Sequence, residues 1–154
     1  NFNTMNDNFT IIITDDDIDD QEFLKIAIPE VTPKANVICA SDGIELMNLL
    51  SGTNKISESS FLHPDLIFLD LNMPLMDGYE VLRSMKTNVH LKSIPVFVLT
   101  TSEFEYDKIK SVAYGADGFY SKPMTPVDLK NIVIEVFSKC QKMAQYDVMK
   151  KRVS

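Results

Sequence analysis

The sequence predicts an α/β domain in which a parallel β-sheet is covered by helices on both faces. Short apolar runs recur along the 154 residues, helical patterns lie between them, and the composition is ordinary for a globular domain, with 45% hydrophobic and 24% charged residues. Neighbouring parallel strands need a crossover connection, which is usually a helix. Regular alternation of the two patterns therefore indicates this fold class, and a chain of this length forms one domain.

The predicted strands are short, and four of the five are rich in Ile, Val, Leu or Phe, as is typical of strands buried on both faces. They are Phe9–Thr14, Asn36–Ala40, Leu66–Leu71, Val96–Thr100 and Gly118–Tyr120.

The predicted helices fill the intervals between these strands. The first is expected to end before Pro29, because proline lacks the N–H that a helix interior needs. Residues 1–8 are predicted to be a disordered segment, and residues 51–64, rich in Ser, Thr and Asn, a long surface loop. The helices are Asp19–Ile28, Gly43–Leu50, Gly78–Lys86, Tyr106–Tyr114 and a long one from Pro126 onward.

Charge and composition exclude several classes of protein. The formal net charge of -7 opposes attraction to a phosphate backbone, so direct binding to nucleic acid is not expected. No apolar run approaches the ~18 residues of a membrane span, and no signal peptide is apparent, so membrane insertion is not expected either. The two cysteines, Cys39 and Cys140, are too few for a disulfide framework. We therefore expect reduced thiols and a cytoplasmic location.

Acidic residues follow two of the predicted strands directly. Asp15 and Asp16 come after the first strand, and Asp70 lies at the carboxyl end of the third. If these strands are neighbours the three carboxylates converge, and their repulsion makes a cation the natural partner. Mg²⁺ suits them because it prefers hard oxygen ligands and bridges to phosphate. The nearby Asp17, Asp19 and Asp20 have a simpler interpretation as a solvated turn that caps the next helix.

Two further strand ends carry groups that can contact phosphate. Thr100 ends the fourth strand with a hydroxyl, and Lys122, which precedes a proline, follows the fifth with an ammonium. A carboxylate nucleophile, a metal, a hydroxyl and a lysine are the groups needed to form and stabilise an acyl phosphate.

At these residues the chain resembles the receiver domain of two-component response regulators, from about Phe9 to Phe137. The resemblance implies a doubly wound sheet with strand order 2-1-3-4-5. It also implies that Asp70 is the phosphoacceptor and that the Mg²⁺ ligands are Asp15, Asp16, Asp70 and the backbone carbonyl of Asn72. Thr100 and Lys122 would contact the phosphoryl oxygens. The matching motifs are Ile11–Asp17, Asp65–Pro74 with Met76–Gly78, Ile94–Val96 before Thr100, and Gly115–Asp117 before Lys122 and Pro123.

Two residues depart from the family's pattern. Thr101 stands where alanine is common, and the larger side chain is expected to slow access to the site. The aromatic switch position, three residues before the lysine, is Phe119, which lacks a tyrosine hydroxyl. The switch, formed by Thr100 and Phe119, would therefore depend on packing alone.

The resemblance implies a phosphoacceptor that signals through the face made by the fourth helix, fifth strand and fifth helix, and not an enzyme. We expect a receiver domain over residues 9–138 and, over residues 139–154, an extension of the last helix with a basic tail. No output domain is expected, so the protein would act by docking or by phosphorelay. Its partner would be a sensor histidine kinase or a histidine phosphotransfer protein, and the chain is similar to regulators of bacterial phytochrome-type kinases.

Two alternatives remain open. A haloacid dehalogenase-type phosphatase uses the same groups but needs a second aspartate two residues after the nucleophile, where this chain has Asn72. An adaptor without phosphorylation would not need all five site residues, which this chain nevertheless has.

The last helical pattern is longer than the domain requires. Residues 139–154 hold five basic residues and one acidic, a net of +4 that leaves -11 for residues 1–138. Met143, Ala144 and Val148 would project an apolar stripe into water unless covered. A solvated, frayed tail is the simpler alternative, but we favour a homodimer through this helix or docking on an acidic partner.

Overall fold

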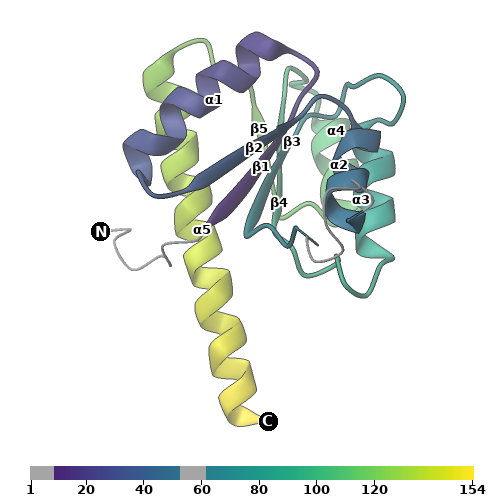
Figure 1. The fold of residues 1–154 in the computed structure, drawn as a ribbon, viewed down its shortest axis with the longest axis vertical. Coiled ribbons are helices and arrows are strands. Elements are labelled where there is room, and N and C mark those ends of the chain that lie inside the picture. The colour runs from purple at the N-terminus through teal and green to yellow at the C-terminus, as the bar shows by residue number, and fades with distance from the viewer. Residues whose placement is uncertain (1–8, 53–61) are drawn as a thin grey trace.

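A computed structural model describes residues 9–52 and 62–154 as a parallel five-stranded sheet with helices on both faces (Figure 1). The strand order is β2-β1-β3-β4-β5, which confirms the predicted fold class and topology. The strands are β1 (Thr10–Thr14), β2 (Asn36–Ala40), β3 (Leu66–Leu69), β4 (Val96–Thr100) and β5 (Gly118–Ser121). The helices are α1 (Ile18–Val31), α2 (Gly43–Ser51), α3 (Gly78–Lys86), α4 (Glu105–Ala113) and α5 (Pro126–Val153).

The sheet separates two apolar cores. Helices α2, α3 and α4 lie on one face and α1 and α5 on the other (Figure 1). Side chains alternate between the faces along each strand, so Ile12 packs against α2 and α3, while Ile11 and Ile13 pack against α1 and α5. Burial on both faces explains why the sequence shows continuous apolar runs.

Aspartates begin three of the helices on the side of the sheet where the strands end. Asp17 accepts hydrogen bonds from the backbone N–H groups that open α1, as one of the sequence interpretations held. Asp42 caps α2, and Asp77 forms a reciprocal capping box with Glu80 in α3.

Helix α1 differs from the prediction because it continues through Pro29 to Val31. Proline removes one backbone donor, and here it does so near the end of the helix, where few bonds remain to be lost. The Thr32 N–H still donates to the Ile28 carbonyl at 2.8 Å and closes the last turn.

Strand β3 also differs, since it ends at Leu69 and not at Leu71. Asp70 is consequently the first residue beyond the strand. Two other predictions, the disordered segment 1–8 and most of the loop 51–64, fall on residues outside the described part of the chain.

Helix α5 runs for 28 residues and extends beyond the body of the domain (Figure 1). The predicted apolar stripe is only partly exposed, because Met143 packs against the core that α1 and α5 share. Ala144 and Val148 are exposed, and Tyr146 and Met149 project from the same segment with 66% and 65% of their surfaces accessible. No helix in the described residues is long and apolar enough to cross a membrane.

Candidate functional site

The backbone pairing of β1 and β3 brings the predicted acidic residues together. Thr14 and Leu69 are partners in the parallel register, so the residues that follow them leave the sheet side by side. The Asp70 N–H donates to the Thr14 carbonyl at 2.9 Å, and the Asp15 N–H donates to the Ala40 carbonyl of β2 at 3.1 Å. Asp15 and Asp70 are therefore positioned by the sheet itself.

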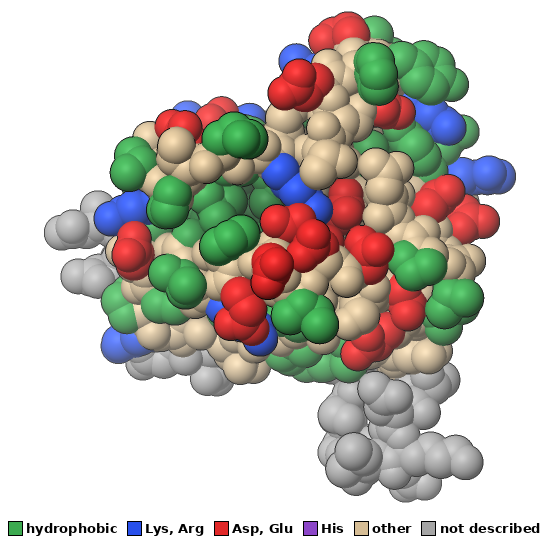
Figure 2. Space-filling model, turned by 90° about the horizontal axis from the view of Figure 1, so that it is seen from above, with side chains coloured by type: hydrophobic (Ala, Val, Ile, Leu, Met, Phe, Trp, Pro, Cys, Tyr) green, Lys and Arg blue, Asp and Glu red, His purple; other side chains and the backbone are tan. Residues whose placement is uncertain are grey.

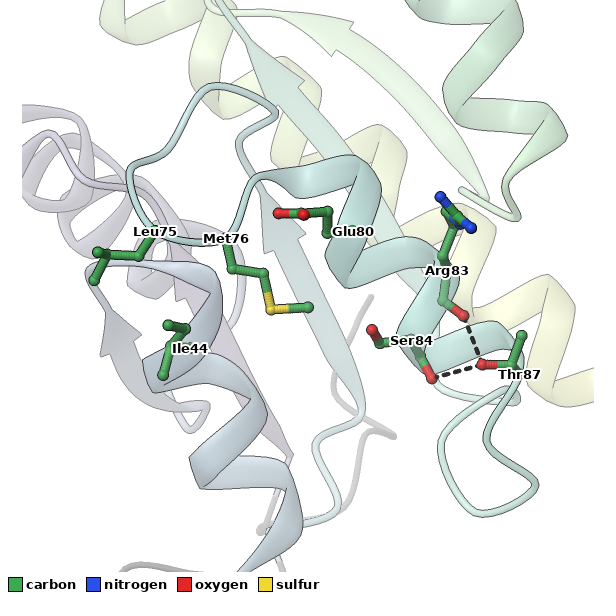
Figure 3. A pocket seen from close by; sticks show the side chains of 7 residues that line it. All are labelled: Ile44, Leu75, Met76, Glu80, Arg83, Ser84 and Thr87. Atoms are coloured by element: carbon green, nitrogen blue, oxygen red, sulfur yellow. Dashed lines mark hydrogen bonds between the residues drawn. The ribbon is translucent and has the colours of Figure 1, made fainter.

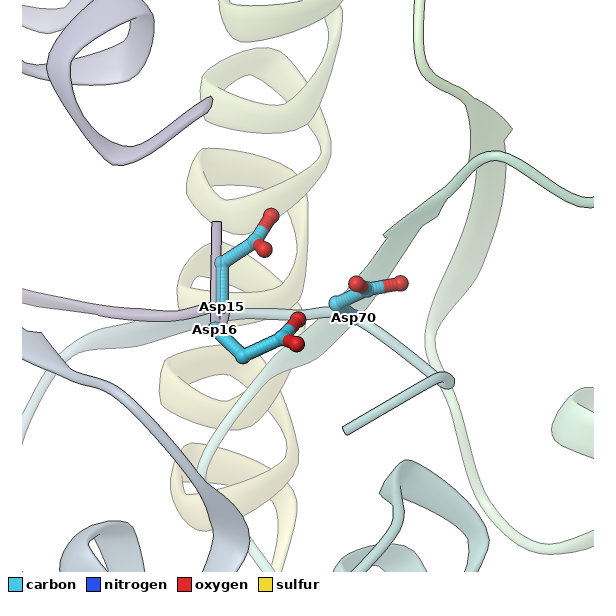
Figure 4. A group of neighbouring side chains, drawn as sticks. All are labelled: Asp15, Asp16 and Asp70. Atoms are coloured by element: carbon cyan, nitrogen blue, oxygen red, sulfur yellow. The ribbon is translucent and has the colours of Figure 1, made fainter. Parts of the chain in front are cut away.

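Three carboxylates form a cluster at this edge. Oxygens of Asp15, Asp16 and Asp70 all lie within 4.8 Å of one another (Figure 4). Asp15 and Asp70 are 3% and 5% exposed, whereas Asp16 faces solvent. Seen from above, acidic side chains gather near the middle of this face beside a basic one (Figure 2). The donor set fits a hard divalent cation such as Mg²⁺, with one side open to water or phosphate.

Lys122 enters the cluster from the end of β5. Its Nζ lies 2.7 Å from Asp15 Oδ2, 2.7 Å from Asp20 Oδ2 and 3.3 Å from Asp70 Oδ2. Its backbone N–H donates to the Thr100 carbonyl at 2.7 Å. Burial on its own would lower the pKa of the ammonium, but the hydrogen bonds to Asp15 and Asp20 and the charge of Asp70 raise it above its ordinary value. Lys122 is therefore a permanent cation here.

Burial raises the pKa of the Asp15 carboxyl from 3.8 to about 6. The hydrogen bonds from Lys122 and from the Asp17 N–H oppose this shift, and the charge of Asp70 adds to it. One lysine does not neutralise this group of carboxylates, so further positive charge would stabilise the site.

Thr100 carries the buried hydroxyl that the sequence predicted. Its side chain is fully buried, and its Oγ1 has no hydrogen-bond partner among the described residues. Thr14 Oγ1 is likewise buried without a partner among the described residues. A ligand oxygen that reached the Thr100 hydroxyl could accept its hydrogen bond. Phe119 is half-buried and packs in the core on the α2 and α3 side, opposite Val98 in the register. Tyr120, the next residue along the strand, packs on the other face.

The loop after Asp70 is held close to the strand end. Asn72 is exposed, and its backbone N–H donates to Asp70 Oδ1 at 3.4 Å. The Gly78 N–H donates to the Leu71 carbonyl at 3.0 Å. A Cβ at Gly78 would lie 2.5 Å from the Asp70 carbonyl oxygen. Glycine is therefore required for α3 to begin this near the candidate phosphoacceptor.

Two features were not identified from the sequence. Asp20 was interpreted only as part of a solvated turn, although it contacts Lys122; its place on the first turn of α1 was the available signal. A second network joins α3 to α4, where Asp107 accepts hydrogen bonds from Tyr79 and Ser102, each at 2.5 Å.

One hollow lies apart from this edge. It has a volume of about 600 Å³ between α2 and α3, and the residues around it include Ile44, Leu75 and Arg83 (Figure 3). None of the residues that line it belongs to the carboxylate cluster, so it gives no support to a small-molecule active site at Asp70.

Comparison with known proteins agrees with this geometry. A family model described as the response regulator receiver domain matches residues 11–134. Response regulator Rcp1 of Synechocystis is 35% identical over 123 residues, which are 80% of this chain and 82% of that protein. The probable transcriptional regulator ycf29 of Pyropia yezoensis is 39% identical over 98 residues, but the match spans only 40% of its length.

Solved structures are also similar. The phosphorylated cyanobacterial phytochrome response regulator RcpA superposes with a TM-score of 0.74 at 33% identity, covering 82% of this chain and 89% of that one. The Mn²⁺-bound form of Rcp1 gives a TM-score of 0.74 at 34% identity, with coverage of 84% and 92%.

Proposed function

The chain belongs to the response regulator receiver domain family, and from this we propose that its Asp70 accepts a phosphoryl group from a histidine kinase. The observation that carries the proposal is the surrounding of Asp70. Its buried carboxylate lies in a group of carboxylates, 3.3 Å from the Lys122 ammonium. It lies at the same sheet edge as Thr100, whose hydroxyl has no partner in the part of the chain that the structure describes. The clustered carboxylates repel one another, whereas Lys122 and Thr100 could donate hydrogen bonds to an acyl phosphate formed on Asp70.

The proposed reaction is a transfer between two side chains. An oxygen of Asp70 attacks the phosphorus of a phosphohistidine, the P–N bond breaks, and the imidazole leaves with the electron pair and takes up a proton. Lys122 and Thr100 donate hydrogen bonds to the phosphoryl oxygens, where negative charge accumulates. Mg²⁺ held by Asp15, Asp16, Asp70 and the Asn72 carbonyl would supply positive charge to those oxygens. The carboxylate cluster and the Mn²⁺ bound in Rcp1 support this assignment.

Intact mass tests the phosphoacceptor directly. Incubation with acetyl phosphate and Mg²⁺ should add the mass of one phosphoryl group, and hydroxylamine should remove it, because acyl phosphates are labile. Asp70→Asn should show no gain, since an amide is a far poorer nucleophile than a carboxylate. The matched control is Asp19→Asn, an exposed aspartate of the same edge, which should still be modified. Modification of Asp70→Asn would reject the assignment.

The kinase is proposed to dock beside this site. A partly apolar groove of about 260 Å³ lies between α1 and the loop that follows Lys122, and Phe23, Ile26 and Met124 are exposed around it. A helix that carries the phosphohistidine would cover these side chains while it presents its imidazole to Asp70. Ile26→Asp should block transfer from the cognate kinase and leave modification by acetyl phosphate unchanged.

Output is proposed to pass through Thr100 and Phe119. Movement of the Thr100 hydroxyl toward a phosphoryl oxygen would open space that Phe119 fills, and this would change the face of α4, β5 and α5. Thr100→Ala should still accept the phosphoryl group, but phosphorylation should no longer change the face of α4, β5 and α5. Amide shifts on phosphorylation that stay confined to the Asp70 pocket in the natural protein would reject this coupling.

We propose that the extension of α5 forms a homodimer. Tyr146 and Met149 are exposed on this extension, and residues 139–154 carry a net charge of +4 against -11 for residues 1–138. The alternative is that an acidic surface of a partner protein covers the extension. Deleting residues 141–154 should lower the mass measured by light scattering from dimer to monomer and leave phosphorylation intact. A natural protein that is monomeric with and without phosphate would reject the dimer.

The proposal is for a signalling receiver and not for an enzyme that turns over a small substrate. It would work in the cytoplasm, by docking or by phosphorelay. A phosphatase of the haloacid dehalogenase type would need an acid at the position of Asn72. Turnover of small phosphate esters is the test, and the natural protein should show negligible turnover. Asn72→Asp is the variant to compare with it, because it supplies the acid that such a phosphatase needs.

A further inference from the structure

A carboxylate outside the three-carboxylate cluster that fits a cation also contacts Lys122. Asp20 projects from the first turn of α1, and its Oδ2 lies 2.7 Å from Lys122 Nζ, as close as Asp15 Oδ2. The Asp20 side chain is 28% exposed and that of Lys122 is 12% exposed, so water screens this ion pair only partly.

The lysine ammonium has three donors, and each has a carboxylate partner here. An ammonium offers three N–H groups and no acceptor, and the three oxygens of Asp15, Asp20 and Asp70 lie within 3.3 Å of it. Two of these partners belong to the oxygen cluster that fits a cation, and Asp20 does not. A cation and a phosphoryl group would therefore engage Asp15 and Asp70 and leave Asp20 free to keep Lys122.

We propose that Asp20 is a positioning residue, which anchors the Lys122 ammonium at the site when Asp15 and Asp70 are engaged by Mg²⁺ and the phosphoryl group. The inference rests on the proposed function. A lysine on a flexible stem loses considerable freedom when it is placed against one phosphoryl oxygen, and a second carboxylate that already holds it reduces that loss. Asp20 would thus favour both cation binding and phosphorylation, although it touches neither ligand.

The start of α1 is built to hold Asp20 in this place. The Gln21 Nε2 donates to the Asp15 carbonyl at 2.6 Å, and Asp17 caps the helix. The first turn is therefore tied to the same junction that carries the cluster. Asp19, the preceding residue, is exposed and has no ion pair among the described residues. It provides a matched control, with the same charge on the same turn.

The test is a double-mutant cycle with Mg²⁺ alone as the first probe. Calorimetric titration of Mg²⁺, and initial rates of modification by acetyl phosphate, are measured for Asp20→Asn and Asp19→Asn, each in the natural chain and with Lys122→Met. Asp20→Asn should weaken Mg²⁺ binding and slow modification about fivefold, and Asp19→Asn should change each less than about twofold. With Lys122→Met, Asp20→Asn should have no further effect, because its role passes through the lysine. Thermal unfolding confirms that each variant is folded.

Two results would overturn the inference. Equal effects of Asp20→Asn and Asp19→Asn would mean that Asp20 contributes only general negative charge. An undiminished effect of Asp20→Asn in the Lys122→Met chain would mean that it acts without the lysine. Failure of the phosphoacceptor proposal is seen separately, as modification that persists in Asp70→Asn, while the Mg²⁺ coupling between Asp20 and Lys122 is measured without any phosphorylation.

Discussion

Replacing Asp15 with asparagine should stabilise the metal-free protein at neutral pH, although it removes a ligand of the proposed cation site. The carboxyl is 3% exposed, and burial raises its pKa to about 6, even with Lys122 at 2.7 Å. The amide keeps the size of the side chain and an acceptor for the Asp17 N–H, which now donates to Asp15 Oδ1 at 2.9 Å. The substitution therefore removes a buried charge while it preserves the local hydrogen bond.

The magnitude follows from the two pKa values. Asp15 has an ordinary value of 3.8 and a folded value of about 6. A shift of about 2 units corresponds to ~3 kcal/mol in the free energy of unfolding. Because the folded state binds the proton more tightly than the unfolded state, the unfavourable contribution is absent below the unfolded value. It develops as the pH rises from about 4 and is complete somewhat above pH 6. Asparagine does not titrate, so the variant escapes it.

Urea unfolding in EDTA, followed by circular dichroism at a series of pH values from about 4 to 7, measures this effect. The quantity of interest is the unfolding free energy of Asp15→Asn minus that of the natural protein, which should increase by ~3 kcal/mol across the series. Asp19→Asn controls for the loss of one negative charge from the same acidic turn. A difference between Asp15→Asn and the natural protein that stays constant with pH would refute the argument that burial holds this carboxyl in an unfavourable charged form.

Three further predictions concern the same edge of the sheet and its neighbour. Gly78→Ala should cost about 2 kcal/mol in urea unfolding and slow acetyl phosphate modification, because its Cβ would meet the Asp70 carbonyl oxygen at 2.5 Å; unchanged stability would contradict this packing. Mg²⁺ at about a hundredfold excess over its dissociation constant should add ~2.7 kcal/mol of stability and raise the melting temperature, with a smaller rise in Asp16→Asn; an equal rise would place the metal elsewhere. Tyr79→Phe should cost about 1 kcal/mol in urea unfolding, since Asp107 loses one of its two hydrogen-bond donors, and an unaltered midpoint would show that water replaces the hydroxyl.

Much of the fold and of the candidate site was predictable because the relevant signals are local. A strand buried on both faces must be apolar throughout, so the charged residue that follows it marks the strand end, as Asp15 does. Asp70 gives the same signal, although the predicted strand ran past it to Leu71. The carboxyl ends of parallel strands meet at one edge, so these residues were expected to converge before any distance was known. The strand order itself came from the resemblance, and the register of β1 with β3 agrees with it.

The mistaken predictions concern places where several local outcomes have similar free energies. Pro29 was expected to end α1, but a proline near the end of a helix removes little, and packing of the helix on α5 keeps the last turn. Met143 was expected to need a partner chain to cover it, but α5 carries it against the core of its own domain. The outcome at such positions depends on what the neighbouring elements cover.

The sequence by itself determined the alternation of strands and helices, the acidic and basic groups at the strand ends, and the family, because each depends on residue type and order along the chain. Only the tertiary structure decided that Asp20 joins Asp15, among the five clustered aspartates, in meeting Lys122, which lies 102 residues from Asp20. Asp19 and Asp20 are the same residue type on the same turn, and they differ only in direction. That direction depends on how α1 rests on the sheet, a property of packing between distant elements that no short stretch of sequence records.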